Sequence, residues 1–406
     1  MVNLSSTTPP ALDGLRVLEL TTMVAAPFCG KLLAALGADV LKIETPKTGD
    51  PSRRRGPFPG DVPHIERSGT FLYLNTGKRG LTLNVNDPQG RVILGELAAQ
   101  ADVLIHDVQP GRAAELGLDR DSLSRINQDL IVAAVTPYGS SGPNADHRAY
   151  DINVFHAAGE GNLLPNGLAL DQFPDRAPIT AGSMMGSYQG GITAAVGIAA
   201  AVFARMGGEP GQFVDCSIQE AQLAIGYLPV QRLEAEGFVE TRFSRFFRVG
   251  GVMPAEDGYV ELLTLEPRQW ESLGEFLGSP AWASPERFQD PAAHGAEMNR
   301  RLREWTGSRP KDWLYHQGQA QGVPFASYYT PKEVFDNPQQ RARGYFVNVD
   351  HPEAGNYEYA GLPFRMGETL PSLERAPLLG EHNNQVLENL GYTPEAIVML
   401  ARAGVI

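Results

Sequence analysis

The first third of the chain alternates short aliphatic and β-branched runs with segments of helical periodicity, and this alternation restricts the fold more than any other feature. Strands are predicted over residues 15–20, 38–44, 79–86, 101–107 and 130–139, and helices over 26–37, 88–100 and 120–128. In such an alternation each helix serves as the crossover between two strands, and crossovers of this kind join parallel strands. We therefore expect an α/β fold with a Rossmann-like, mostly parallel sheet covered on both faces. No GxGxxG motif follows a strand, so strand-end loops would have to hold a nucleotide-bearing ligand.

The rest of the sequence predicts a second, smaller domain. The apolar segment 190–208 is rich in alanine and glycine and too short for a membrane span, so we expect a buried helix there. A polar connector over 231–251 leads into mixed strand and helix patterns, and strand alternation returns over 345–366 before a terminal helix. We predict a large Rossmann-like domain over residues 1–200, completed by about 335–406, and a small α+β domain over 225–330.

Charge and cysteine usage restrict the partners and the compartment. The formal net charge is -13, which argues against nucleic acid or an anionic membrane as a partner. Cys29 and Cys216 are the only cysteines, which excludes a disulfide framework and a cysteine zinc site and favours a reducing cytoplasm. The histidines are scattered without metal-ligand spacing and no signal peptide is evident, so we expect a cytoplasmic protein without a metal site.

Six segments resemble the successive signatures of the class III coenzyme A transferases of the CaiB/BaiF type. They run over residues 12–54, 76–94, 101–118, 208–221, 255–262 and 376–392, and include "ETPKTGDPSRR", "ADVLIHDVQPGR" and "APLLGEHNNQVLENLGY". This family includes formyl-CoA and crotonobetainyl-CoA:carnitine transferases, and its superfamily includes the α-methylacyl-CoA racemases. The resemblance implies a homodimer of interlocked rings that acts on an acyl-CoA and a carboxylic acid, without a tightly bound cofactor.

The stretch "DQFPDRAPITAGSMMGSYQGG" separates the activities of this superfamily. The resemblance places a nucleophilic aspartate at Asp175, with Asp171 as the rival, although an aspartate in such a turn often only caps local N–H groups. The racemases resemble one another in a His–Asp pair, and its positions are Tyr150 and Ser187 here. Neither hydroxyl is a suitable base for abstracting an α-proton. We therefore expect a CoA transferase, with a racemase or a non-catalytic CoA-binding paralogue as the alternatives.

The mechanism that the resemblance implies is covalent. The aspartate carboxylate attacks the acyl-CoA thioester to give a mixed anhydride and CoA thiolate, which then forms an aspartyl-CoA thioester that the acceptor acid attacks. Gly182 and Gly186 lie in the loop whose N–H groups would stabilise the oxyanion. Gly250 and Gly251 would form the glycine-rich loop that closes over the site, although they fit an ordinary turn as well.

The resemblance also implies a set of CoA contacts. They fall on Val24, Ala25, Thr45, Leu83, Asn84, Val85, Asn86, Asp107, Val108, Gln109, Arg112, Thr136, Pro137, Tyr138 and Gly139. Thr45, Glu115 and Thr136 stand where several relatives carry cations. Replacement phosphate partners are Arg112 with Arg53, Arg54, Arg55, Lys78 and Arg79, unless these charges are only a solvated surface. Arg176, beside Asp175, would favour a dicarboxylic acceptor.

Overall fold

The computed structural model describes residues 8–226, 228–244, 249–369 and 371–406. The chain divides into two compact units, which we describe separately. Unit 1 comprises Met1–Gly159, Ala181–Gly226 and Arg341–Ile406, and unit 2 comprises Glu160–Thr180 and Tyr227–Gln340.

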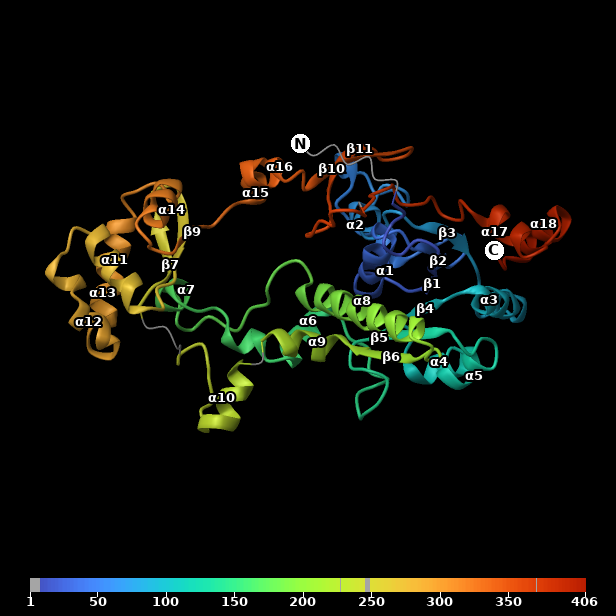
Figure 1. The fold of residues 1–406 in the computed structure, drawn as a ribbon, viewed down its shortest axis with the longest axis horizontal. Coiled ribbons are helices and arrows are strands. Elements are labelled where there is room, and N and C mark those ends of the chain that lie inside the picture. The colour runs from blue at the N-terminus through green and yellow to red at the C-terminus, as the bar shows by residue number, and fades with distance from the viewer. Residues whose placement is uncertain (1–7, 227, 245–248, 370) are drawn as a thin grey trace. The chain divides into compact units, whose positions relative to one another are not determined.

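Unit 1 is built on a six-stranded sheet in which every pairing is parallel, in the order β3-β2-β1-β4-β5-β6 (Figure 1). The strands are β1 (Arg16–Leu20), β2 (Asp39–Glu44), β3 (Arg79–Thr82), β4 (Val103–His106), β5 (Ile131–Thr136) and β6 (Phe213–Ser217). The sheet confirms the predicted Rossmann-like α/β class. Its order reverses between β1 and β4, and in open α/β sheets ligands bind beyond the carboxyl ends of the strands at such a point.

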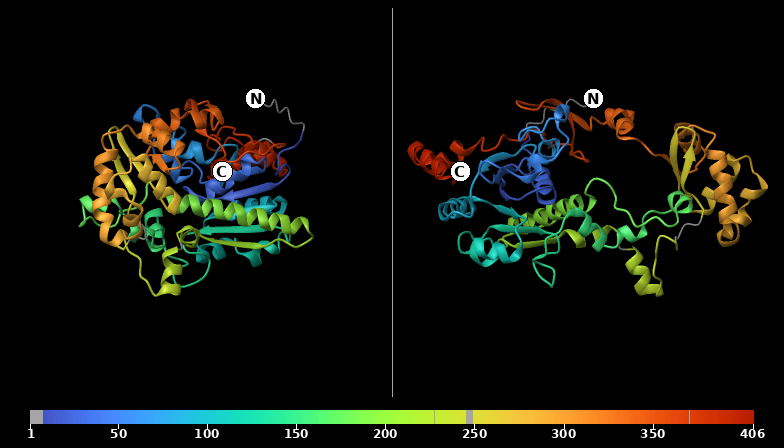
Figure 2. Two further views of the ribbon diagram at one scale, coloured as in Figure 1. Left: turned by 60° about the vertical axis from the view of Figure 1, so that its left-hand side comes forward. Right: turned by 180° about the vertical axis from the view of Figure 1, so that it is seen from behind.

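Successive strand residues face two separate cores. Val17 and Val40 face a layer formed by α1 (Ala25–Ala35) and α8 (Met185–Met206), whereas Leu18 and Leu41 face the opposite layer. The second layer contains α3 (Pro88–Gln100), α4 (Pro110–Leu116), α5 (Arg120–Ser124), α17 (Asn383–Asn389) and α18 (Pro394–Ala403). Because both faces are covered, the strands are mostly apolar on both sides, as in other buried parallel sheets, and Glu19, Lys42 and Glu44 are buried charged exceptions on β1 and β2. The left view of Figure 2 shows α8, in yellow-green, running alongside the sheet.

Helix α8 is long and apolar enough to cross a membrane by length and composition alone, but it packs as a core helix against α1, β5 and β6. Glycine permits this packing, because a Cβ on Gly191 would lie 2.4 Å from the Ala25 carbonyl oxygen. The expectation of a buried helix is correct for this face only. On the other face, Val196 is 65% and Phe203 78% exposed.

The remaining elements of unit 1 are shorter. They are α2 (Gly69–Leu74), α6 (Asp151–Ala157), α9 (Ile218–Ile225), two 3-10 helices (Pro51–Arg54 and Pro59–Asp61) and the antiparallel pair β10 (Phe346–His351) and β11 (Gly355–Ala360). Strand β3 ends at Thr82, whereas the prediction extended it to residue 86. The chain turns there because Asp87 caps α3 by accepting from the Gln89 N–H, and Pro88 begins the helix.

Unit 2 contains a three-stranded antiparallel sheet packed against helices. The sheet consists of β7 (Gly251–Ala255), β8 (Gly258–Leu262) and β9 (Phe325–Ser327). The helices are α7 (Leu168–Gln172), α10 (Leu228–Glu236), α11 (Pro267–Phe276), α12 (Pro285–Gln289), α13 (Pro291–Thr306), α14 (Lys311–Ala320) and α15 (Pro331–Asp336), with 3-10 turns at Glu160–Leu163 and Ala281–Ala283. A further helix, α16 (Pro338–Ala342), spans the boundary between the units. The predicted polar connector is wrong in part, because α10 occupies its start; residues 245–248 lie outside the described residues.

Candidate active site

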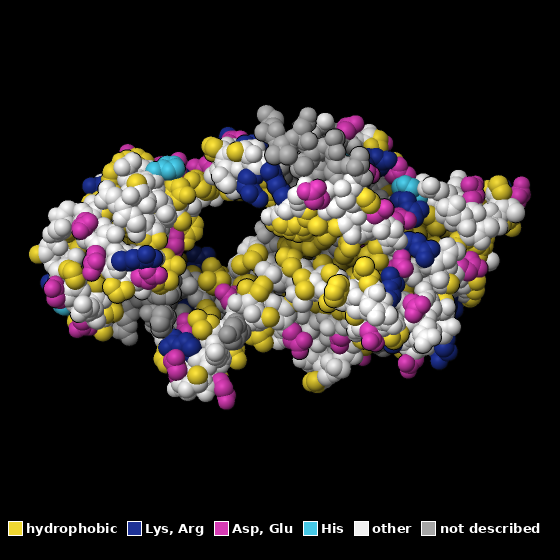
Figure 3. Space-filling model, viewed as in Figure 1, with side chains coloured by type: hydrophobic (Ala, Val, Ile, Leu, Met, Phe, Trp, Pro, Cys, Tyr) yellow, Lys and Arg dark blue, Asp and Glu magenta, His cyan; other side chains and the backbone are white. Residues whose placement is uncertain are grey.

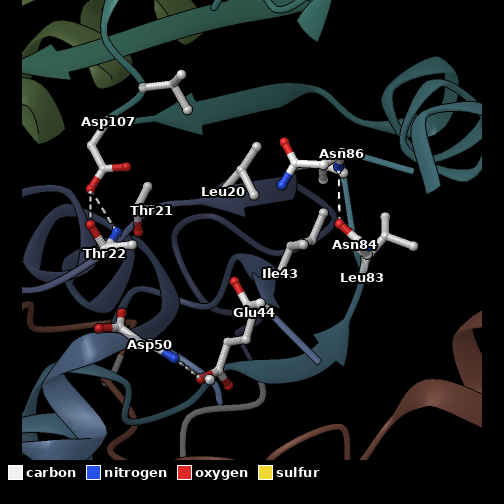
Figure 4. A pocket seen from close by; sticks show the side chains of 14 residues that line it. Leu20, Thr21, Thr22, Ile43, Glu44, Asp50, Leu83, Asn84, Asn86 and Asp107 are labelled. Atoms are coloured by element: carbon white, nitrogen blue, oxygen red, sulfur yellow. Dashed lines mark hydrogen bonds between the residues drawn. The ribbon is translucent and has the colours of Figure 1, made fainter. Parts of the chain in front are cut away.

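A pocket of about 140 Å³ lies in unit 1 where β1, β2 and β4 end (Figure 4). Seven of its lining residues are among the CoA contacts expected from the sequence: Thr45, Leu83, Asn84, Val85, Asn86, Asp107 and Val108. These residues come from two loops that follow strands and from the turn before α3. The Asn86 N–H donates to Asn84 Oδ1 at 3.1 Å and holds that turn closed.

Arginine side chains stand beside Asn86. Arg112 donates from Nη2 to Asn86 Oδ1 and from Nη1 to Glu115 at 2.6 Å. Arg91, which the sequence reasoning missed, donates to the Asn86 carbonyl oxygen at 2.9 Å, and both guanidinium groups lie on exposed residues. On another loop of the pocket, Arg54 donates to the Thr48 carbonyl oxygen at 2.7 Å. Guanidinium groups therefore contact two of the loops that form this pocket, although none of the three arginines lines it.

The remaining expected CoA contacts lie outside the lining of this pocket. Val24 and Ala25 are buried at the start of α1, and Gln109 donates to the Asp146 carbonyl oxygen at 2.9 Å. The segment Thr136, Pro137, Tyr138 and Gly139 follows β5, with Thr136 fully buried. The pocket thus brings together one part of the expected set only.

A cluster of buried charged side chains, Glu19, Lys42, Asp50 and Lys78, lies next to the pocket, and Asp50 belongs to its lining. Lys42 on β2 donates to Asp50 at 2.9 Å, to Glu19 at 3.2 Å and to the Thr21 carbonyl oxygen at 3.1 Å, which uses all its N–H groups. Lys78 pairs with Glu19 at 2.7 Å. These four charged side chains are fully buried, so each charge is compensated by its partners within the cluster. Burial raises the pKa of Asp50, but the Lys42 ammonium and N–H donors outweigh it and hold that pKa below its ordinary value.

Two of the expected phosphate partners are therefore wrong. Lys78 is fully buried within this cluster. Arg53 is also fully buried; it pairs with Glu44 at 2.7 Å and with Glu66 at 2.6 Å. The five N–H donors of Arg53 go to Glu44, Glu66 and the carbonyl oxygens of Ile65 and Pro377, so none is left for a ligand phosphate.

The carboxyl group of Asp107 lines the pocket, and one of its two oxygens accepts hydrogen bonds. Its Oδ2 accepts from the Thr22 N–H at 2.6 Å and from the Thr22 hydroxyl at 2.7 Å (Figure 4). Burial raises its pKa to about 6 despite these two hydrogen bonds. Near neutral pH this group is an acceptor that a ligand donor such as an amino group would satisfy.

The two candidate nucleophiles lie in unit 2 and have different surroundings. Asp171, on α7, pairs through Oδ2 with Arg303 Nη2 at 2.5 Å. Asp175 lies exposed in the turn after α7, where the Arg176 N–H donates to the Phe173 carbonyl oxygen at 3.1 Å. Within the described parts of the chain, no hydrogen bond or ion pair engages the Asp175 carboxylate. A carboxylate without a partner is the better nucleophile of the two.

The expected glycine-rich loop has a backbone that demands glycine. Gly250 has a φ of 98°, and a Cβ there would lie 2.5 Å from the Leu262 carbonyl oxygen; Gly251 has a φ of 84°. Both conformations are strained for other residues. The Gly250 N–H donates to Asn299 Oδ1 at 3.0 Å.

The segment before α8 belongs to unit 1 and contains Gly182, whereas Gly186 lies in the first turn of α8 itself. Ser183 and Met184 have φ values of 68° and 54°, so the backbone is left-handed there. The Asp151 carboxylate accepts from the Ser187 N–H at 2.7 Å. Tyr150 is 75% exposed at the start of α6. No His–Asp pair stands at the two racemase positions.

Comparison with known proteins agrees with these features. Residues 12–383 match the family described as CoA-transferase family III. The chain belongs to this family. It is therefore an enzyme of the family III CoA-transferases, whose substrates are acyl-CoA thioesters and carboxylates.

Relatives and solved structures of the family III CoA-transferases extend over nearly the whole chain. It is 30% identical to a formyl-CoA:oxalate CoA-transferase from Rhodopseudomonas palustris (strain BisA53), covering 97% of both chains. It is also 30% identical to one from Streptomyces avermitilis, covering 98% of this chain and 99% of the other. A crystal structure of a CaiB/BaiF family protein from Brucella suis is 28% identical, with a TM-score of 0.80, over 94% of this chain and 100% of that one.

Proposed function

We propose that this family III CoA-transferase moves CoA from an acyl-CoA donor to a carboxylic acid through covalent intermediates on Asp175. The Asp175 carboxylate attacks the thioester carbonyl, the C–S bond breaks, and a mixed anhydride and CoA thiolate form. The thiolate attacks the aspartyl carbonyl and releases the donor acid, which leaves an aspartyl-CoA thioester. The acceptor carboxylate then attacks the aspartyl carbonyl of this thioester, which expels CoA thiolate and forms a second mixed anhydride. The thiolate attacks the acceptor's acyl carbonyl in that anhydride, which gives the new acyl-CoA and frees the Asp175 carboxylate.

One contrast in unit 2 carries the choice of nucleophile. Both carboxylates are exposed, but that of Asp171 is held by Arg303 at 2.5 Å, whereas that of Asp175 has no hydrogen bond or ion pair among the described residues. An ion-paired carboxylate gives up stabilising contacts when it attacks, so the unpaired group reacts more readily. Gly182 and Gly186 support the proposal as sources of backbone N–H groups for the oxyanion. Gly250 and Gly251 would form the tight turn of the glycine-rich loop, where the Gly250 N–H is already bound to Asn299.

We also propose that the pocket of unit 1 binds the nucleotide end of CoA. Its exposed arginines, Arg91 and Arg112, would hold phosphate groups, in place of Arg53 and Lys78. Unit 1 would then act as the CoA-binding domain and unit 2 as the small domain. The relatives named formyl-CoA:oxalate CoA-transferase make formyl-CoA and oxalate the first substrate pair to test. Arg176, next to Asp175, supports a dicarboxylic acceptor.

Trapping with hydroxylamine tests the nucleophile. The protein is incubated with formyl-CoA and other acyl-CoA donors, treated with hydroxylamine, and mapped by peptide mass spectrometry, with Asp175→Ala as the control. A hydroxamate on Asp175, absent from the variant, is expected. A hydroxamate on Asp171 would move the chemistry to that residue, and no adduct alongside normal CoA binding would favour the racemase or the non-catalytic protein.

A homodimer completes the proposal. The exposed face of α8 carries Ile192, Val196 and Phe203, spaced so that they share one side of the helix. Hydrophobic side chains gather over this part of unit 1 (Figure 3). A surface of this kind marks an interface more often than free solvent exposure.

We place the enzyme in the cytoplasm, since Cys29 and Cys216 are both free and buried thiols.

A further inference from the structure

Helix α13 of unit 2 contacts both segments that the proposed mechanism needs from this unit. Asn299 accepts from the Gly250 N–H at 3.0 Å, and Arg303 donates to Asp171 at 2.5 Å. These two side chains are four residues apart on α13, so they project from one face of the helix. One rigid element thus holds the glycine turn and the segment that carries Asp175.

The rest of unit 2 reinforces this connection. Helix α7, which carries Asp171, also packs against β7, the strand that Gly251 begins. From α7 the chain runs directly into the turn of Asp175, which the Arg176 N–H closes on Phe173. A displacement of α7 therefore moves Asp175 with it. A displacement of the Asn299 side chain would likewise move the glycine turn, because Asn299 accepts the Gly250 N–H.

The Arg303 pair is suited to orientation more than to stability. The Arg303 side chain is 20% exposed and that of Asp171 is 55% exposed, so solvent screens their attraction. Such pairs contribute little to folding stability. The guanidinium nevertheless fixes the direction of the Asp171 carboxylate, and misplacing a reacting group by about 1 Å can cost roughly 100-fold in rate.

We propose that Arg303 and Asn299 are positioning residues, which hold the Asp175 segment and the glycine turn on α13 in the arrangement that the transfer reaction uses. This inference rests on the proposed function, because it assigns these residues a role in the chemistry at Asp175. It also gives Asp171 a definite task, which is to anchor its segment to Arg303 rather than to attack the thioester.

Steady-state kinetics with the full chain test the proposal, with formyl-CoA and oxalate or whichever donor trapping identifies. Arg303→Met is expected to lower kcat by about 10- to 100-fold, from the cost of misplacement, while KM for the acyl-CoA and the urea midpoint change little. Arg300→Met is the matched control, because Arg300 lies on the same helix in an exposed pair with Glu304 and is expected to leave kcat unchanged. Asn299→Leu should lower kcat, and Asn299→Asp, which keeps an acceptor oxygen, should restore it.

A charge exchange separates this inference from the identity of the nucleophile. The double variant Asp171→Arg, Arg303→Asp keeps an ion pair and is expected to recover most of the kcat lost in Arg303→Met. An unchanged kcat in Arg303→Met, or an equal loss in Arg300→Met, would overturn the positioning role even with Asp175 labelled by hydroxylamine. An inactive exchange variant with the label on Asp171 in the wild type would instead overturn Asp175 as the nucleophile.

Discussion

Removing the ammonium group of Lys42 should destabilise unit 1 strongly, because its main carboxylate partner would remain buried without a cation. Lys42 lies 2.9 Å from Asp50 and 3.2 Å from Glu19, and all three side chains are fully buried. In Lys42→Met, Glu19 keeps Lys78 at 2.7 Å, but among the described residues Asp50 keeps N–H donors from Met23 and Ser52 alone. Breaking one partner out of a buried pair costs about 3–5 kcal/mol.

The pH dependence of this cost follows from the direction of each pKa. The pKa of Lys42 is raised, since its carboxylate partners outweigh burial, so its contribution is complete below about pH 10. The pKa of Asp50 is lowered, so its contribution is complete above about pH 4 and is lost as the pH falls further. In Lys42→Met the pKa of Asp50 should instead rise, because burial then acts without the ammonium. The penalty should therefore shrink as the pH falls from 7 toward about 4, where Asp50 takes up a proton.

Amide hydrogen exchange measures the effect unit by unit. Peptides from β1 and β2 should exchange faster in Lys42→Met, while peptides from β7 and β8 of unit 2 serve as the internal reference. All four tryptophans lie in unit 2, so their fluorescence does not report on this change directly. Adding Asp50→Asn should recover part of the loss. A cost below about 1 kcal/mol, or a double variant no more stable than the single one, would refute the reasoning about buried pairs.

Three further outcomes are expected. Arg91→Gln and Arg112→Gln should each weaken binding of CoA more than binding of dephospho-CoA in calorimetry. The control Arg125→Gln, on an exposed residue, should leave the affinity for both ligands unchanged. Equal losses of affinity for both ligands would exclude a contact with the 3′-phosphate. Because the pKa of Asp107 is raised to about 6, its ionisation opposes folding as the pH rises from about 4, so Asp107→Asn should gain urea resistance at neutral pH and none at about pH 4. Phe203→Glu should convert the proposed homodimer to monomer in sedimentation equilibrium, and an unchanged dimer would place the interface elsewhere.

Local patterns in the sequence were sufficient to predict the sheet of unit 1. Apolar runs such as those that become β4 and β5 are nearly continuous because both faces of the sheet are covered. Element ends were less accurate, as at β3, because a capping aspartate and a proline override the strand propensity of the residues before them.

Ion pairs between residues far apart in the chain could not be predicted from the sequence. Lys42 stands in the strand "DVLKIE", where a lysine is usually expected to face solvent, yet it is buried against partners from two other segments. Arg303 and Asp171 are 132 residues apart, and no local signal joins them. The expectation that Arg53 and Lys78 bind phosphate is wrong for the same reason: basic character is visible in a sequence, whereas a buried carboxylate partner is not.

The buried cluster also limits where an anionic ligand can be recognised. Carboxylates of Glu44, Asp50 and Asp107 line the pocket, and the cations beneath them are already used by Glu44 and Asp50. A phosphate placed against this lining would meet like charge without a free cation, which is costly at low dielectric. A base that donates hydrogen bonds fits the lining better, since Asp107 presents an acceptor there. The phosphates of CoA should then lie toward Arg91 and Arg112, where exposed guanidinium groups exchange Asn86 and Glu115 for stronger partners at little cost.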